Sequence, residues 1–447
     1  MDTKKLRQKI LDLAIRGKLV PQDPNDEPAS VLLERIRAEK EQLIKEGKIK
    51  RAKKAAASDK SHYENVPFEV PEGWCWTTIG ELFQLQAGKF IEAPQISTCK
   101  DATHIYPCYG GNGLRGYVES YNRDGLFPII GRQGALCGNI NIAEGKFYAT
   151  EHAVVVETFA NIDIQLFVYF LIQLNLNQYA TATAQPGLAV KTINEVPIPL
   201  PPINEQHRIS MAIEKSLDTL SEIDQSKHAI SKSILQLKSR ILDLAISGKL
   251  ATQDCSDEPA LELLRRINPS FAPCDNRHYR QLPDSWEICQ LKDIFDITMG
   301  QSPAGDTING KSGIEFHQGK LNFTEKYLSE SGQYTTAPSK VAVPESLLLC
   351  VRAPVGIVNI TKREICIGRG LCSLRPKYDI DCLFWLYMLS TLKDHFDENA
   401  TGSTFKAISG EIIRNATIPF PPVPEQKRIL LKINELFYFL DKITAVL

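Results

Sequence analysis

The segment from Gly305 to Ser312 has residue types and spacing that could do chemistry. It reads GDTINGKS and fits GxxxxGK[ST], the pattern of a loop that holds nucleotide phosphates with backbone amides and a lysine. Such a loop needs a strand before it and a helix after it, because the amides at the helix N-terminus cradle the phosphates. The residues after Ser312 read GIEFHQG, which is typical of a strand and a turn. A nucleotide site at Lys311 is therefore disfavoured, although a nucleotide-using enzyme stays an alternative.

A second glycine-rich segment, residues 111–116, reads GNGLRG and matches the dinucleotide-binding pattern GxGxxG. The next residues, YVESY, continue as a strand, whereas a dinucleotide fold places a helix N-terminus there. We interpret the segment as a tight glycine turn that exposes Tyr109, Asn112 and Arg115. The 8 histidines show no HExxH spacing, and no GxSxG pattern occurs. We therefore expect no catalytic residue, cofactor site or metal site in this chain.

Basic and amide side chains recur in glycine-rich loops of both halves of the chain, and these residue types can read DNA. Arginine suits bidentate contact with guanine, glutamine and asparagine suit adenine, and serine, threonine and lysine suit phosphate. Adjacent glycines let the backbone approach a groove. For each residue the alternative is a structural role, such as an arginine that braces its own turn. The candidate DNA-binding residues are Tyr109, Asn112, Arg115, Arg132, Gln133, His152, Gln185 and Lys191 in the first half, and Gln301, Ser302, Lys311, Arg352, Arg369, Ser403, Thr404 and Lys406 in the second.

The composition is that of an ordinary globular protein, 43% hydrophobic and 23% charged. The net charge of −1 excludes a polycation, so a nucleic-acid site must rest on local patches. The lysine-rich stretch at 40–60 could contact phosphates, but a solvated tether explains it better. The 11 cysteines form no CxxC pair, and no signal peptide or transmembrane run is apparent. We expect a cytoplasmic protein with reduced thiols and no membrane contact.

Internal repeats show that the chain consists of two homologous halves. Three ordered matches carry this conclusion, and chance does not supply three of this kind. They are ILDLAIRGKL at 10–19 with ILDLAISGKL at 241–250, IPLPPINEQHRI at 198–209 with IPFPPVPEQKRI at 418–429, and PEGW at 71–74 with PDSW at 283–286.

The stretch from Asn204 to Leu250 predicts one long amphipathic helix. Its apolar residues recur at alternating three- and four-residue spacing, which is typical of a coiled-coil seam. Asn204 can cap the start, and Gly248 can end the helix in a left-handed conformation. The C-terminal repeat holds only the start of this pattern and the N-terminal repeat only its end. We therefore predict that the two chain ends together rebuild a second helix, antiparallel to the central one.

The segments at 61–200 and 275–420 have short β-rich runs and one aromatic-apolar helical run each, which is typical of mixed folds. Trp74 and Trp286 are expected to fill their cores. The predicted fold class is α+β, with two pseudo-symmetric globular domains separated by long antiparallel coiled-coil helices in a circular pseudo-twofold organisation.

These features together resemble the specificity subunit of type I restriction-modification enzymes. The resemblance rests on the repeats and on four further runs: YGGNGLRGY at 109–117, AQPGLAVKTI at 184–193, MGQSP at 299–303 and TGSTFKAI at 401–408. It implies a non-catalytic chain in which each of two target-recognition domains reads one half of a bipartite site in double-stranded DNA. The helices would set the spacing and dock two adenine methyltransferase subunits, and motor-nuclease subunits would join them. S-adenosylmethionine, ATP and Mg²⁺ would then belong to the partners.

The resemblance also implies the domain boundaries. They are an N-terminal helical segment and basic tether at 1–60, the first recognition domain at 61–203, a central coiled-coil spacer at 204–267, the second recognition domain at 268–423 and a C-terminal spacer helix at 424–447. One departure concerns Arg352, which is followed by Ala353-Pro354 where small residues leading to glycine are expected.

The second alternative is a coiled-coil scaffold whose globular domains bind protein.

Overall fold

A computed structural model describes residues 2–49, 66–134, 136–181, 186–274, 279, 281–402 and 406–447. The chain forms two compact units, Met1–Ser226 and Lys227–Leu447. Helix α6 (Ile203–Ile246) begins in the first unit and ends in the second. Its 44 residues confirm the predicted long helix. Gly248 follows it with φ +69°, as expected of a left-handed stop. The predicted cap at Asn204 is wrong, because the helix already begins at Ile203. It does not begin earlier, since Pro201 precedes another proline and is thereby kept out of the helical conformation.

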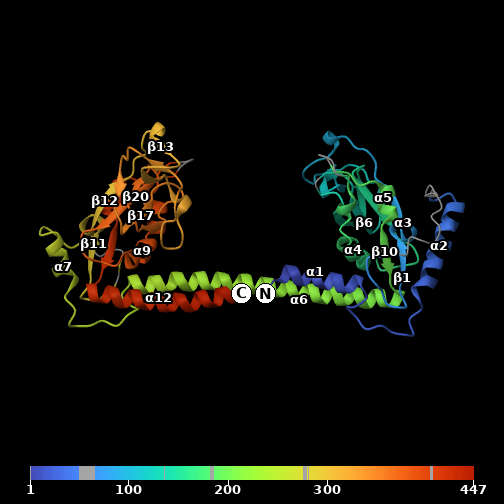
Figure 1. The fold of residues 1–447 in the computed structure, drawn as a ribbon, viewed down its shortest axis with the longest axis horizontal. Helices are drawn as coiled ribbons and strands as arrows, with labels where there is room; N and C mark the ends of the chain where they lie inside the picture. The colour runs from blue at the N-terminus through green and yellow to red at the C-terminus, as the bar shows by residue number, and fades with distance from the viewer. Residues whose placement is uncertain are drawn as a thin grey trace. The chain divides into compact units, whose positions relative to one another are not determined.

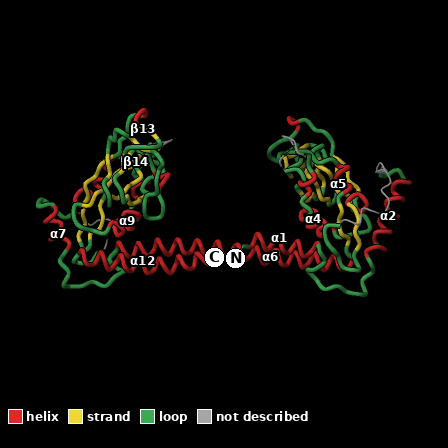
Figure 2. Tube along the Cα trace, in the orientation of Figure 1, coloured by secondary structure: helices red, strands yellow, loops and turns green. Residues whose placement is uncertain are grey.

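Unit 1 is a mixed helix-and-sheet body (Figures 1 and 2). Its two larger sheets have the strand orders β2-β9-β6-β7 and β4-β3-β8-β5, and β3 runs parallel to β8 in an otherwise antiparallel arrangement. The elements are α1 (Thr3–Ile15), α2 (Ala29–Lys45), β1 (Cys75–Thr78), α3 (Ile79–Leu82), β2 (Gln84–Ala87), β3 (Tyr106–Gly110), β4 (Gly113–Val118), β5 (Arg123–Asp124), β6 (Phe127–Gly131), β7 (Ile140–Ala143), β8 (Lys146–Ala149), β9 (Ala153–Glu157), α4 (Ile164–Gln173), α5 (Val190–Glu195), β10 (Pro197–Leu200) and the first part of α6.

Unit 2 repeats this architecture. Its sheets have the orders β12-β20-β17-β18 and β13-β15-β14-β19-β16, and here β14 runs parallel to β19. The elements are the last part of α6, α7 (Ala260–Ile267), β11 (Glu287–Gln290), α8 (Leu291–Ile294), β12 (Phe295–Met299), β13 (Ile308–Asn309), β14 (Ile314–His317), β15 (Tyr334–Thr335), β16 (Val341–Ala342), β17 (Ser346–Cys350), β18 (Val358–Thr361), β19 (Ile365–Ile367), β20 (Leu371–Pro376), α9 (Cys382–Ser390), α10 (Lys393–Glu398), α11 (Gly410–Asn415), β21 (Thr417–Phe420) and α12 (Val423–Val446). The matching sheets confirm the predicted α+β fold with two related halves.

We call the globular part of each unit its lobe: it runs from β1 to β10 in unit 1 and from β11 to β21 in unit 2. The first and last strands of each lobe pair in a two-stranded sheet. In unit 1, β1 pairs antiparallel with β10, so that Cys75 lies opposite Leu200. In unit 2, β11 pairs with β21, so that Glu287 lies opposite Phe420. The chain therefore leaves the helical part and returns to it at neighbouring positions.

The core of each unit joins the lobe to the helices. The predicted core tryptophans Trp74 and Trp286 are each only 6% exposed, which confirms their expected place. Helices α4 and α9 are apolar on most sides and pack between the sheet and the long helices, against α1 in unit 1 and against α12 in unit 2. Because these helices bury almost every face, their sequences read as continuous apolar runs.

The long helices pair antiparallel within each unit, as predicted. In unit 1, Arg7 contacts Asp224 at 3.3 Å, whereas Arg208 near the start of α6 bonds Asp26 at 2.5 Å. In unit 2, Lys238 contacts Asp441 at 2.5 Å and Arg428 bonds Asp257 at 2.6 Å. In both units the residue numbers rise along one partner as they fall along the other.

One buried glutamate in each unit explains much of the repeated sequence. Glu205 accepts from Trp74 Nε1 at 2.9 Å and from Gln22 Nε2 at 2.7 Å. The equivalent Glu425 accepts from Trp286 at 2.9 Å and from Gln253 at 2.5 Å. Burial raises the pKa of both carboxyl groups, and these donors counteract the rise. The repeated EQ and PxxW segments, together with Gln22 and Gln253, therefore build one polar junction twice.

Candidate nucleic-acid interface

Four loops of unit 1 meet at one end of its sheets. Backbone bonds tie them together: Lys89 N donates to Ala149 O at 2.9 Å, and Thr150 N donates to Tyr109 O at 2.9 Å. Arg132 N then donates to His152 O at 3.0 Å. The loops that follow β2, β3 and β6 thus surround the turn between β8 and β9. We call this end of the lobe the loop surface.

The loop surface of unit 1 brings four predicted residues around one hollow. The hollow has a volume of about 440 Å³ and is open to solvent. Its walls include Asn112, Arg115, Gln133 and His152 together with Leu114 and several glycines. Asn112, Arg115 and Gln133 are exposed and project amide or guanidinium groups, the types that read base edges.

Glycine is required where two of these loops touch. A Cβ on Gly131 would lie 1.8 Å from Gly111 O, and a Cβ on Gly111 would lie 3.0 Å from Gln133 O. Real side chains do not fit at the first distance. The close approach brings the Asn112 turn against Gln133, so the glycines of this region position these two side chains.

Several buried polar atoms beside the hollow have no partner among the described residues. They are Arg132 Nε, His152 Nδ1 and Glu151 Oε2. His152 Nε2 lies 3.1 Å from Glu151 Oε1, which leaves the other ring nitrogen unsatisfied. Buried polar atoms are normally hydrogen-bonded, so this cluster is suited to ordered water or a polar ligand.

Three other predicted residues of unit 1 have different positions. Tyr109 is half-buried and packs edge-on against Phe147 with ring centroids 5.6 Å apart, and burial raises the pKa of its hydroxyl. Its side chain therefore belongs to the core beneath the loop surface. Lys191 lies exposed on α5 and does not line the hollow. Gln185 lies outside the described residues.

Unit 2 has the same backbone framework with different side chains. Gln301 N donates to Ile367 O at 2.9 Å, Gly368 N donates to His317 O at 2.8 Å, and Val351 N donates to Gly370 O at 2.9 Å. These bonds match those of Lys89, Thr150 and Arg132 in turn. The candidates Arg132 and Arg352 do not stand at equivalent positions, because Arg132 corresponds to Val351. Gln133 corresponds to Arg352, because Gln133 forms an antiparallel β-bridge with Gly187 and Arg352 forms the equivalent β-bridge with Ala407.

The loop surface of unit 2 contains predicted residues that contact one another. Ser302 Oγ lies 2.9 Å from Gln318 Oε1, and Arg369 N lies 3.5 Å from Ser302 Oγ. Arg352 and Arg369 are exposed. Lys406 contacts Asp397 at 3.7 Å, and its carbonyl accepts from Ala353 N at 3.0 Å. Ser403 and Thr404 lie outside the described residues.

Lys311 lies in a loop that cannot act as a phosphate cradle. The loop joins β13 to β14, and no helix follows it. Asn309 Oδ1 already accepts from Lys311 N at 2.9 Å and from Ser312 N at 2.8 Å. The amides that a phosphate would need are occupied, so the nucleotide-site interpretation is wrong.

Two residues of the framework were missed in the sequence. Lys89 is exposed and takes the place of Gln301, which the shift of 212 between PEGW and PDSW would have indicated. Gln318 corresponds to Gly110 of unit 1. Gly110 follows Tyr109, whose carbonyl accepts from Thr150 N, and Gln318 follows His317, whose carbonyl accepts from the equivalent Gly368 N. The residues before Gln318 form a buried strand and did not mark it as a candidate DNA-binding residue in the sequence.

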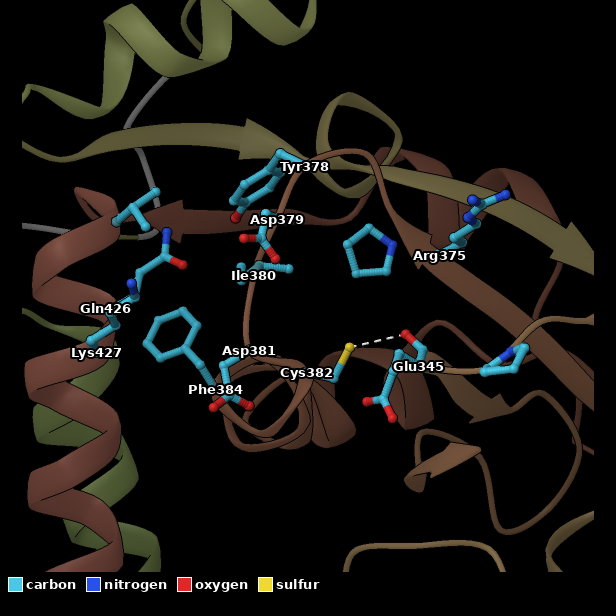
Figure 3. A pocket seen from close by; sticks show the side chains of 13 residues that line it. Glu345, Arg375, Tyr378, Asp379, Ile380, Asp381, Cys382, Phe384, Gln426 and Lys427 are labelled. Carbon is cyan, nitrogen blue, oxygen red and sulfur yellow. Dashed lines mark hydrogen bonds between the residues drawn. The ribbon is translucent and has the colours of Figure 1, made fainter. Parts of the chain in front are cut away.

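A further pocket of unit 2, with a volume of about 580 Å³, lies at the other end of β20 from the loop surface (Figure 3). Gln426 lines it, and its buried Oε1 has no partner among the described residues. In unit 1 the equivalent Gln206 Oε1 accepts from Asp163 N at 3.0 Å. Within the described part of the chain, no cluster of His, Cys, Asp and Glu could hold a metal ion. None of the described helices is both long and apolar enough to cross a membrane.

Comparisons with known proteins agree with the repeated framework. The family model for the type I restriction modification DNA specificity domain matches residues 71–235 and 283–445. The EcoprrI specificity subunit of Escherichia coli is 42% identical over 167 residues, which cover 37% of this chain and 41% of that protein. The EcoEI specificity subunit of Escherichia coli is 28% identical, over 99% of this chain and 90% of the relative.

A solved structure shares the fold. It comes from work on complex assembly and conformational transition of the type I restriction-modification system, with a TM-score of 0.61 at 23% identity, and the match covers 85% of this chain and 94% of the other. The match shows that the two chains share a fold. The chain belongs to the type I restriction-modification specificity family and contains two copies of its DNA specificity domain.

Proposed function

We propose that each loop surface reads one half of a bipartite site in double-stranded DNA. One observation carries the proposal: the same backbone framework recurs in both units and presents different polar side chains at equivalent positions. Lys89 corresponds to Gln301, Gly110 to Gln318, and Gln133 to Arg352. Two readers built on one framework would recognise different half-sites, because base edges are distinguished by the side chains that face them.

The helices would set the spacing between the half-sites. At 1.5 Å per residue, the 44 residues of α6 correspond to a length of about 66 Å. Half-sites on one face of B-DNA lie about 34–36 Å apart or a multiple of that distance. A helix of this length is therefore suited to a site whose halves are separated by a stretch of unread base pairs.

The helices would also dock two adenine methyltransferase subunits. Although α12 pairs with α6, it keeps large apolar side chains exposed, with Leu431 at 71%, Tyr438 at 56% and Val446 at 78%. In α6, Met211 and Leu235 are likewise exposed. Exposed apolar residues of this size on long helices are suited to packing against partner helices. Motor-nuclease subunits would complete the assembly, and S-adenosylmethionine, ATP and Mg²⁺ would be bound by the partners.

Comparison of genome methylation with and without this gene tests the proposal, in a host that expresses the partner subunits. Loss of one bipartite adenine-methylation motif is the expected result. No change would contradict the proposal and favour a coiled-coil scaffold that binds protein.

An insertion in α6 tests whether this helix sets the distance between the half-sites. Four residues added to α6 near Lys227 should alter the distance between half-sites and leave the bases of both unchanged. A change in the bases themselves would refute the role assigned to the helix.

A further inference from the structure

Gln318 occupies a defined place on the loop surface of unit 2. Its carbonyl accepts from Gly370 N at 3.1 Å, and its side chain is exposed. The equivalent residue of unit 1 is Gly110, which has no side chain. Unit 2 therefore carries an amide at a position where unit 1 presents only backbone.

The two glycines around Arg369 make room for Gln318. A Cβ on Gly368 would lie 2.6 Å from Gln318 Oε1 and 3.0 Å from its Cα. A Cβ on Gly370 would lie 2.4 Å from Gln318 O. Neither position tolerates a larger residue without displacement of Gln318. The Gly-Arg-Gly run thus holds the glutamine close to the arginine backbone.

A short chain of hydrogen bonds orients the Gln318 amide, with its oxygen toward Ser302. Arg369 N can only donate, so Ser302 Oγ accepts from it at 3.5 Å. The Ser302 hydroxyl is then free to donate, and it donates to Gln318 Oε1 at 2.9 Å. The amide nitrogen, with two N–H groups, has no partner among the described residues. Gln318 consequently presents donors, and the neighbouring Arg369 side chain presents more.

We propose that Gln318 is a specificity-determining residue that donates from Nε2 to guanine in the half-site read by unit 2, with Ser302 as its positioning residue. This inference rests on the proposed function. In the major groove guanine offers two acceptors, N7 and O6, whereas cytosine offers only the N4 donor and adenine combines one donor with one acceptor. A surface of donors matches guanine and rejects cytosine. One such contact typically discriminates by roughly 5- to 150-fold.

The test is the methylation motif of cells that express the full chain with its partner subunits. Gln318→Glu replaces the donors with acceptors, and carboxylates accept from cytosine N4. We expect one guanine position of one half-site to lose its preference or shift toward cytosine, while the other half-site is unchanged. Ser302→Ala should broaden the same position, because the amide can then turn over. Gln236→Glu makes the same chemical change at an exposed position of α6 and should leave the bases of the motif unchanged.

The outcomes separate the two levels of the proposal. If the wild-type chain directs no motif, the proposed function fails. If it directs one and Gln318→Glu alters no base, or if the altered position carries any base other than guanine in the wild type, the reading role of Gln318 is refuted. If Gln318→Glu alters a guanine position that Ser302→Ala leaves unchanged, the positioning role of Ser302 is refuted.

Discussion

Replacing Gln206 with methionine should cost more stability than the same replacement at Gln426, although the two residues are equivalent in the repeat. Gln206 Nε2 donates to Pro201 O at 2.9 Å, and its Oε1 accepts from Asp163 N at 3.0 Å. Gln426 Nε2 donates to Pro421 O at 2.9 Å, but its Oε1 faces the pocket of Figure 3 without a partner among the described residues. Methionine matches the length of glutamine and can form neither bond.

The magnitudes follow from the groups left unpaired. Gln206→Met leaves a carbonyl and an N–H without partners, and each such buried group costs about 1–3 kcal/mol. Gln426→Met leaves the Pro421 carbonyl unpaired and removes a contact with the Tyr378 hydroxyl, but it also removes an oxygen that was already unsatisfied. The gain from burying an apolar side chain is similar at both sites and cancels in the comparison. We expect losses of about 2–6 kcal/mol in unit 1 and about 1 kcal/mol or less in unit 2.

Hydrogen exchange measured by mass spectrometry across a urea series gives the free energy of unfolding of each unit separately. Peptides from β6 and β9 report on unit 1, and peptides from β17 and β20 report on unit 2. In each variant the unit without the substitution is the internal control. Equal losses, or a larger loss at Gln426, would refute the reasoning and indicate that Gln426 Oε1 is satisfied in solution.

Three further predictions concern charge and the loop surfaces. Burial alone would raise the pKa of Glu315, but bonds from Arg363 and Ser331 N and the neighbouring His317 hold this pKa at about 2, below the ordinary value of 4.5. A carboxyl group with a lowered pKa contributes stability that is lost as the pH falls from about 4.5 to 2. Arg363→Met should therefore weaken unit 2 at neutral pH and reduce its loss of stability over this pH range, as measured by the same hydrogen-exchange assay. Lys89→Ala should lower the salt dependence of DNA binding by the assembled complex, with a change in slope of about 1, if Lys89 contacts a phosphate, whereas Gln301→Ala at the equivalent neutral position should not. Gln133→Ala should relax base preference in the half-site read by unit 1 alone, and a change in both half-sites of the methylation motif would contradict separate reading.

The architecture was predictable because the repeats constrain it physically. A seam such as that from Leu220 to Leu244 cannot be hidden by one helix, and the split copies at the two chain ends predict the antiparallel pairing. The core positions of Trp74 and Trp286 were predictable for the same reason, since the two residues are equivalent in the sequence repeat. The start of α6 was not, because Asn204 has the preferred cap chemistry while the two prolines before it determine where the helix begins.

The loop surfaces were only partly predictable. Asn112, Arg115, Gln133 and His152 carry glycine-turn signals and do meet around one hollow. Gln318 carries no local signal, because its place depends on hydrogen bonds to a turn about 50 residues away, from Gly368 to Gly370. Equivalent positions in the two units were not predictable from residue type either: Arg132 and Arg352 are both arginines that follow a strand, but the backbone bonds match Arg132 with Val351.

The strand pairs that close the two lobes make each lobe an exchangeable insert. Because Cys75 lies opposite Leu200 and Glu287 opposite Phe420, each lobe begins and ends at adjacent points of the frame. Glu205 and Glu425 make the same bonds on the frame side of these strands. Exchange of a whole lobe between related chains would therefore keep the strand pairs and the two glutamate junctions, whereas lobe-to-helix bonds such as that from Asp163 N to Gln206 Oε1 would have to form again. Selection would then hold the frame constant while the inserts diversify.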